Sequence, residues 1–328
     1  MRLLPVLMSV LILTACASPP ERPAAPEAAA VTVENCGRKL TFDKPPAKVV
    51  TGYQPALETL FALGLQDRVA GRTDFSESAF LPGHKELYDK IPEISPSIML
   101  PQKEVMLAQG ADFVLDNTMT SFDASGGYAT VDELGAAGTP VYILGGWCDA
   151  ATTLEFTIED TFTDLRNLGA IFGVPERAAK LIAELRAKLA EVTTKVGALP
   201  KVKVLATDGG KGPVNAYGGA GLTNQMITLA GGQNVLADVK GDYTEVSAEK
   251  IAAAAPDALL VCDYAVLSGE KMPAATAKAD EAFAIAKNSP AARGKRFLAL
   301  PAAAQHPGYR NILAIADIAR FLHPEAFA

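Results

Sequence analysis

One long amphipathic stretch near the middle of the chain constrains the fold more than any other feature. Between Pro175 and Gly197, apolar residues recur at spacings of three and four, which places them on one stripe of an α-helix. Proline suits a first helical turn, and Gly197 followed by Pro200 is typical of a helix end. The spacing predicts one continuous helix over 175–197, about 33 Å long. The stripe consists of Leu181, Ile182, Leu185, Leu189, Val192 and Val196.

The segments on either side of this helix repeat one order of elements. A hairpin-like segment comes first, and short β-like runs then alternate with helical patterns both before and after the helix. Two segments match closely, because in each a Glu opens an Ala-rich helix and an Asp follows eight residues later, ahead of an apolar strand. These pairs are Glu104 with Asp112 and Glu249 with Asp257. Such duplication favours one lobe on each side of the helix over a single large domain.

Alternation of strands and helices is typical of βαβ units around a parallel sheet. The sequence therefore predicts an α/β fold of two Rossmann-like lobes with mainly parallel sheets, joined by one long α-helix. We expect the first lobe to span 31–174, the interlobe helix 175–197 and the second lobe 198–328.

The N-terminal segment has the composition of an export signal. Residues 1–15 contain one Arg after the initiator Met and then an apolar run through Leu13 that is too short to span a membrane, and they indicate a signal peptide. The tetrad that ends at Cys16 resembles a bacterial lipobox, which implies that Cys16 is the lipidated first residue of the mature chain; ordinary cleavage nearby is the alternative. Residues 16–30 are rich in Pro and Ala, which indicates a tether.

Charge points to no polymer as a partner. The formal net charge is -7, and no cluster of Lys and Arg occurs, which argues against nucleic acid and against attraction to anionic lipid. We therefore expect contact with a membrane through the lipid anchor only. A hydrophobic content of 49% is sufficient for large cores.

Three cysteines remain once Cys16 is assigned to lipid. Cys262 lies in an apolar run, which favours a buried thiol, whereas Cys36 and Cys148 lie in turn-like surroundings. In an exported protein these two are the candidate disulfide, although connectivity does not follow from sequence.

The residues do not indicate a catalytic or metal centre. No hydrolase, zinc-protease, redox or phosphate-loop motif occurs, and His84, His306 and His323 lack ligand spacing. We expect no cofactor and no metal site.

Aromatic, polar and basic residues instead follow the predicted strands, where open α/β sheets bind ligands. Together they indicate a cleft with stacking faces and two guanidinium groups, which suits a large planar or anionic ligand. Each residue also has an ordinary alternative, such as a core-capping Tyr, or an ion pair of Arg72 with Asp74 or Glu77. The candidate ligand-binding residues are Tyr53, Arg72, Thr73, Asn117, Trp147, Tyr217, Tyr243, Tyr264, His306, Tyr309 and Arg310.

Taken together, these segments resemble the solute-binding proteins of ABC importers for iron chelates, haem and cobalamin. The resemblance covers nearly all of the mature chain, including the lipobox, the segment around 54–73, the run IFGVPERAAKLIAEL and the tail from His306. It implies a monomeric, bilobed periplasmic binding protein with one connecting helix, which delivers its ligand to an ABC permease through both lobes. By the same resemblance, Glu104 and Glu249 are the surface acids that dock on the permease.

The hypothesis that follows is a lipid-anchored, extracytoplasmic protein that captures a ferric siderophore or similar Fe(III) chelate in the cleft between its lobes. It would reside in the periplasm or on the outer cell surface. Haem or cobalamin is the alternative ligand within this class. An exported enzyme on a related two-lobed scaffold, and a surface adhesin or signalling module, are the alternatives from other classes, because fold alone does not separate them.

Overall fold

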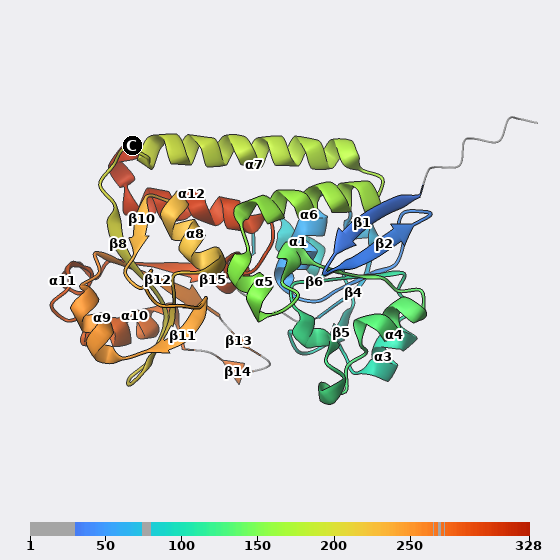
Figure 1. Cartoon of the computed structure of the whole chain (residues 1–328), viewed down its shortest axis with the longest axis horizontal. Coiled ribbons are helices and arrows are strands. Elements are labelled where there is room, and N and C mark those ends of the chain that lie inside the picture. The colour runs from blue at the N-terminus through green and yellow to red at the C-terminus, as the bar shows by residue number, and fades with distance from the viewer. Residues whose placement is uncertain (1–29, 74–79, 265, 268–269, 272) are drawn as a thin grey trace, which may run out of the picture.

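Two α/β lobes lie side by side beneath one long helix in the computed structural model (Figure 1). The structure describes residues 30–73, 80–264, 266–267, 270–271 and 273–328. The predicted signal peptide over 1–15, the lipidation site Cys16 and all but the last residue of the tether over 16–30 lie outside the described residues.

The first lobe is built on a five-stranded sheet in which every pairing is parallel. Its order is β5-β4-β3-β6-β7, and Phe113 and Leu115 of β6 pack into one core while Val114 packs into another. Both faces are therefore covered by helices, as a parallel sheet requires. The strands are β3 (Val49–Thr51), β4 (Val69–Thr73), β5 (Glu93–Ser95), β6 (Phe113–Asp116) and β7 (Val141–Ile143). The helices are α1 (Gln54–Ala62), α2 (His84–Tyr88), α3 (Lys103–Ala108), α4 (Val131–Ala136), α5 (Ala150–Glu155) and α6 (Ile158–Ile171).

A β-hairpin precedes this sheet, as the sequence predicts. Strands β1 (Val31–Asn35) and β2 (Arg38–Phe42) pair in antiparallel fashion around a two-residue turn. Cys36 and Gly37 both have positive φ, 52° and 68°, which is the geometry that two-residue hairpin turns favour.

The second lobe has a mixed sheet with a parallel centre. Its order is β11-β9-β8-β12-β15, with β10 also paired to β8; β8, β10, β12 and β15 are parallel, whereas β9 runs antiparallel to both β8 and β11. The strands are β8 (Val202–Gly209), β9 (Val214–Tyr217), β10 (Gly232–Asn234), β11 (Tyr243–Val246), β12 (Ala258–Asp263) and β15 (Phe297–Pro301), beside the short pair β13 (Val266–Leu267) and β14 (Glu270–Lys271). The helices are α8 (Gly221–Leu229), α9 (Ala248–Ala254), α10 (Ala275–Ile285), α11 (Pro290–Gly294) and α12 (Arg310–Leu322).

The predicted long helix is present as α7 (Pro175–Val196) and connects the two lobes. Leu185, Val192 and Val196 of its apolar stripe are buried in one core that contains side chains of both lobes, and α7 packs on α6 and α12 (Figure 1). This shared core explains why the stripe runs the length of the helix. No helix within the described ranges is long and apolar enough to cross a membrane.

The two matching sequence segments occupy equivalent places in the two lobes. Asp112 precedes β6 and accepts hydrogen bonds from the backbone N–H groups of Ala47 and Lys48, both at 2.8 Å. Asp257 precedes β12 and accepts one from the backbone N–H of Lys203 at 3.0 Å. Each Asp thus ties the start of one strand to the start of its parallel neighbour, so the repeat in sequence corresponds to a repeat in structure.

Candidate functional site

A cleft of about 490 Å³ lies between Trp147 of the first lobe and residues of the second lobe. This volume is within the usual range for small-molecule sites. Its walls come from strand ends, from α10 and from the segment after the short 3₁₀ helix over Ala302–Gln305. The residues that line it are Trp147, Asp208, Asn215, Tyr217, Asp242, Tyr243, Tyr264, Pro273, Lys278, Glu281, Gln305 and His306.

Five of the eleven predicted ligand-binding residues belong to this lining, and all five are aromatic: Trp147, Tyr217, Tyr243, Tyr264 and His306. Tyr217 and Tyr243 are register partners on β9 and β11, with ring centroids 5.1 Å apart. Trp147 meets His306 across the lobes with centroids 5.6 Å apart. Because Tyr243 is still 49% exposed, the cleft offers free aromatic surface for stacking against a ligand.

His306 joins the cleft to the first lobe. Its Nε2 lies 2.9 Å from the hydroxyl of Tyr53, and burial lowers the pKa of the imidazole to about 4. His306 is therefore neutral at pH 7 and can take part in hydrogen bonds without adding charge. Tyr53 is itself held by its backbone N–H, which donates to Thr73 Oγ1 at 3.0 Å, and its φ of 58° is rare for a non-glycine residue. Tyr53 and Thr73 thus lie behind the cleft wall.

Three pairs of residues form what we call the interlobe seam. Besides Tyr53 with His306, the side chain of Asn117 donates to the backbone carbonyl of Pro307. The guanidinium of Arg310 lies 3.1 Å from Glu58 Oε1, and both side chains are almost fully buried. Tyr309, next to Arg310, is buried with its ring near His84. Asn117, Tyr309 and Arg310 therefore lie between the lobes but outside the lining of the cleft.

Arg72 also lies away from the cleft. Its guanidinium stacks 3.5 Å from the ring centroid of Tyr88, donates to the Tyr88 hydroxyl at 2.7 Å and lies 3.5 Å from Glu93. The alternative partners Asp74 and Glu77 lie outside the described residues. Arg72 and Arg310 supply the two guanidinium groups that the sequence suggested for the cleft. Both are thus engaged by partners elsewhere in the fold.

Charged residues that sequence reasoning missed determine the electrostatics of the cleft. Asp208, Asp242 and Glu281 are acidic, and Lys278 is the only cation in the described lining. The ammonium of Lys278 donates to the backbone carbonyl of Cys262 at 2.9 Å and lies 4.9 Å from the ring centroid of Tyr264. The lining therefore carries a net negative formal charge at neutral pH, since His306 is neutral.

Two buried carboxyl groups of the lining have perturbed acidity. Burial raises the pKa of Asp242 to about 6 and also raises that of Asp208, although Asp208 accepts a hydrogen bond from the Tyr243 hydroxyl at 2.9 Å. Lys278 and Glu281 lie three residues apart on one face of α10. That spacing is the signal by which the sequence could have suggested them.

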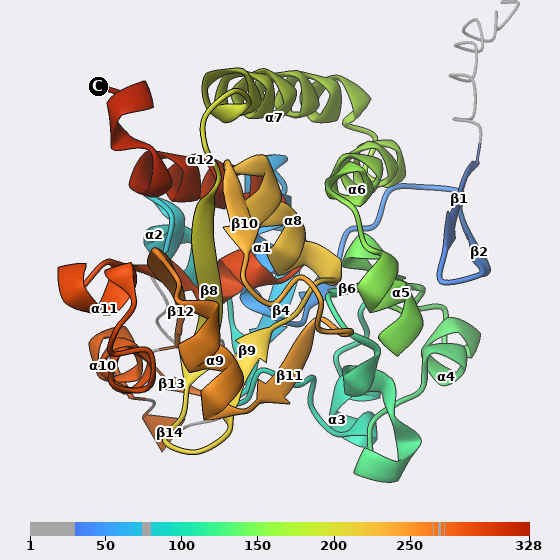
Figure 2. The same cartoon turned by 60° about the vertical axis from the view of Figure 1, so that its left-hand side comes forward.

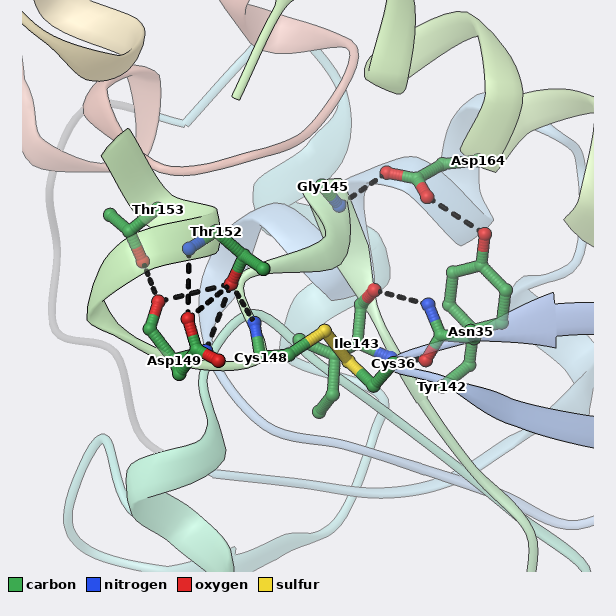
Figure 3. The surroundings of a disulfide bond; sticks show 10 residues. All are labelled: Asn35, Cys36, Tyr142, Ile143, Gly145, Cys148, Asp149, Thr152, Thr153 and Asp164. Atoms are coloured by element: carbon green, nitrogen blue, oxygen red, sulfur yellow. Dashed lines mark hydrogen bonds between the residues drawn. A yellow bond between two sulfur atoms is a disulfide. The ribbon is translucent and has the colours of Figure 1, made fainter. Parts of the chain in front are cut away.

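A disulfide anchors the segment that carries Trp147. Cys36 in the hairpin turn is joined to Cys148, with Cα atoms 5.5 Å apart (Figure 3). Cys262 is a buried free thiol. Asn35 exchanges two hydrogen bonds of 2.8 Å with the backbone of Ile143. Hydrogen bonds thus hold the end of β7 on one side of Trp147, and the disulfide holds its other side.

A buried carboxyl group braces the same segment from α6. Asp164 accepts hydrogen bonds from the backbone N–H of Gly145 at 2.6 Å and from the Tyr142 hydroxyl at 2.8 Å, as Figure 3 shows. Burial raises the pKa of Asp164 to about 7. Trp147 is therefore carried by a segment that is fixed at several points, so its ring forms a preorganised wall of the cleft.

The two predicted docking acids lie on the same side of the molecule. Glu104 and Glu249 are exposed in the first turns of α3 and α9, and both helices lie on the side away from α7 (Figure 1 and Figure 2). Acidic residues in a first turn are also favoured by the helix dipole. Within the described part of the chain, no group of three or more His, Cys, Asp or Glu residues could hold a metal ion.

Known proteins share this architecture. The sequence model of the family described as periplasmic binding protein matches residues 109–304. A cobalamin-binding protein of Halobacterium salinarum is 29% identical over 228 residues, which is 67% of this chain and 55% of that protein. The chain thus spans little more than half the length of that curated relative.

Solved structures extend the likeness to almost the whole fold. A protein of an ABC-type Fe3+-hydroxamate transport system from Saccharomonospora viridis has a TM-score of 0.72 at 25% identity, over 92% of this chain and 100% of that one. A periplasmic haem-binding protein from Roseiflexus sp. RS-1 has a TM-score of 0.66 at 24% identity, over 85% of this chain and 98% of that one.

Proposed function

Because this chain belongs to the periplasmic binding protein family, we propose that it captures a bulky metal chelate in the interlobe cleft and delivers it to an ABC permease. The observation that carries this proposal is the aromatic lining of the cleft, to which Trp147 contributes from one lobe and Tyr217, Tyr243 and Tyr264 from the other. Aromatic faces bind large, flat or rigid ligands through stacking and apolar burial.

The ligand that we favour is a ferric siderophore of the hydroxamate type. The lining combines aromatic faces with a net negative charge, and ferric trihydroxamates carry no negative charge of their own at the metal centre. The structural likeness to the Fe3+-hydroxamate transport protein supports the same choice.

Cobalamin is the second candidate, and a separate observation favours it. The curated relative from Halobacterium salinarum is named a cobalamin-binding protein. A corrinoid is also bulky, rigid and free of negative groups at its rim. Haem is less well suited, because its two carboxylates would face Asp208, Asp242 and Glu281.

Delivery would take place outside the cytoplasm. The export signal over 1–15 and the lipobox cysteine Cys16 support a protein that is anchored by lipid. Glu104 and Glu249 are exposed on the side away from α7, one on each lobe, which supports their role as the pair of acids that docks on the permease. The relatives with printed functions are binding or transport proteins, so the enzyme alternative loses its support.

Fluorescence titration tests the proposal directly, because Trp147 is the only tryptophan of the chain and lines the cleft. We expect one member of a panel of ferric siderophores, cobalamin and haem to quench its emission with a dissociation constant below about 1 μM. In calorimetry, Trp147→Leu should weaken binding about tenfold, since it removes a stacking face. Tyr128→Leu, outside the cleft lining, is the matched control. If the whole panel fails to bind, the proposed function is wrong.

A further inference from the structure

Four residues of the cleft lining each hold a buried polar atom without a hydrogen-bond partner in the described part of the chain. Two are carboxylate acceptors, Asp208 Oδ1 and Asp242 Oδ1, and two are N–H donors, Trp147 Nε1 and Gln305 Nε2. A buried polar atom that lacks a partner costs about 1–3 kcal/mol, and proteins seldom tolerate several together unless another molecule satisfies them. Their common place around one cleft indicates that a ligand does so once these side chains adjust to it.

The two acceptors restrict the ligand more than the two donors. Asp208 already accepts the Tyr243 hydroxyl through Oδ2, at 2.9 Å, and the Cys262 thiol, a weak donor, lies near its carboxyl group, so Oδ1 still lacks a strong donor. Burial raises the pKa of Asp242 to about 6, which leaves this group ionised at pH 7.5. An ionised carboxylate accepts hydrogen bonds but donates none. Asp242 therefore requires N–H or O–H groups on the ligand, and Asp208 requires them in its ionised form.

The cation of the lining offsets these two acceptors only in part, because its charge favours the ionised form of Asp208 alone. The ammonium of Lys278 is directed to the backbone carbonyl of Cys262, and its side chain is almost fully buried. A ligand with carboxylates at its rim would therefore place like charges against Asp208 and Asp242 in a partly desolvated site. A carboxamide rim avoids this conflict, because one carboxamide offers both the N–H that the acids need and the carbonyl that Trp147 and Gln305 need.

We infer that Asp208 and Asp242 are specificity-determining residues, which select chelates whose rim carries carboxamide or ammonium groups and reject chelates whose rim carries carboxylates. This inference rests on the proposed function of the cleft, and it assigns the discrimination to two named side chains. Trp147 and Gln305 complement the carbonyl oxygens of the same rim groups.

The test uses two chelate scaffolds in matched charge states. One is a ferric trihydroxamate whose single terminal group is an ammonium, an acetamide or a succinyl carboxylate. The other is a corrinoid with intact carboxamides or with one side chain hydrolysed to a carboxylate. Calorimetry at pH 7.5 measures the affinity for each member. Within the scaffold that binds, the carboxamide or ammonium member should bind about ten- to hundredfold more tightly than the carboxylate member, as hydrogen bonds to charged groups allow.

Isosteric variants show whether these two acids are responsible. Asp208→Asn and Asp242→Asn should each lower the affinity ratio at least about threefold, because each replaces one charge by a group that can donate, and the double variant should bring the ratio to within about threefold of unity. Asp280→Asn, an exposed acid on α10 whose partner is Lys295, should leave the ratio unchanged. Thermal unfolding verifies that each variant folds, and the two single variants test the inference separately.

Two results would overturn the inference alone: carboxylate members that bind as tightly as carboxamide members to the unmodified protein, or a ratio that both Asn variants leave unchanged. Binding of haem without binding of either scaffold would also overturn the inference alone. If haem fails to bind as well, the proposed function falls and this inference falls with it.

Discussion

The disulfide between Cys36 and Cys148 should contribute a large part of the stability of the first lobe. It joins residues 112 positions apart. In the chain-entropy description, cross-linking a loop of this length stabilises the folded state by about 5 kcal/mol, and removal of native disulfides commonly costs about 2–5 kcal/mol. We therefore expect the double variant Cys36→Ser and Cys148→Ser to lose about 2–5 kcal/mol in the free energy of unfolding.

Ligand affinity should change much less, because other contacts hold the same segment. The two hydrogen bonds between Asn35 and Ile143, and those that Asp164 accepts from Gly145 and Tyr142, remain in the variant. Each contributes about 0.5–1.5 kcal/mol, which is sufficient to keep the end of β7 in place. We expect the dissociation constant for the chelate to rise by less than about tenfold.

Urea unfolding followed by Trp147 fluorescence measures the stability, and calorimetry measures the affinity. Reductant supplies a matched comparison, since it should destabilise the unmodified protein as much as the double substitution does. The variant itself should not respond to reductant, because Cys262 is a free thiol. A loss of stability below about 1 kcal/mol, or a loss of affinity of a hundredfold or more, would refute this reasoning.

Three further predictions concern docking, anchoring and acid stability. Reversal of both Glu104 and Glu249 to Lys should abolish uptake in cells while calorimetry shows unchanged ligand affinity; Glu184→Lys on the exposed face of α7 is the control. Uptake that survives the double reversal would contradict the docking role. Cys16→Ser should move the protein from the membrane fraction to the soluble fraction, and retention in the membrane would contradict the anchor. Burial lowers the folded-state pKa of His306 to about 4, below its ordinary 6.5, so protonation of the unfolded state should reduce stability as the pH falls through this interval. Between about pH 7.5 and pH 5, this loss in the free energy of unfolding amounts to about 2 kcal/mol, and urea unfolding should not show it in His306→Asn. A variant with the same pH dependence as the unmodified protein would contradict this prediction.

The repeat and the helix could be predicted from sequence because both depend on local periodicity. The apolar stripe of α7 follows the 3.6-residue period, and the structure confirms one continuous helix over Pro175–Val196. The alternation of strands and helices confirms two α/β lobes. The antiparallel strands β9 and β11 were not predicted, because a short strand carries no signal for its direction.

The aromatic residues of the site could be predicted from their positions along the chain, whereas its charged residues could not. Tyr264 comes directly after β12, and Trp147 follows β7 after the short 3₁₀ turn over Leu144–Gly146, at sheet edges that expose side chains to a cleft. Arg72 lies near the end of β4 and Arg310 opens α12, yet Tyr88 and Glu58 hold them away from the cleft. Sequence shows where a side chain leaves its strand but does not show which distant partner binds it.

Two of the three acids of the cleft were missed for a related reason, whereas Asp208 lies at the end of β8 and was overlooked there. Asp242 precedes β11 rather than following a strand, and Glu281 lies in the middle of α10. Attention to strand ends alone therefore overlooks residues that neighbouring helices and loops bring to the same cleft. Their role depends on tertiary packing, which raises the pKa of Asp242 and leaves Lys278 directed at a carbonyl group.

The interlobe seam has a consequence for how the protein would engage the proposed permease. To separate the lobes would expose or unpair the buried Arg310 and Glu58, at a cost of about 3–5 kcal/mol. The spacing between α3 and α9 should therefore be nearly the same with and without a ligand. The empty protein would then offer the permease the same pair of acids as the loaded one. We expect the two forms to compete for the transporter, so that an excess of the empty protein slows uptake instead of accelerating it.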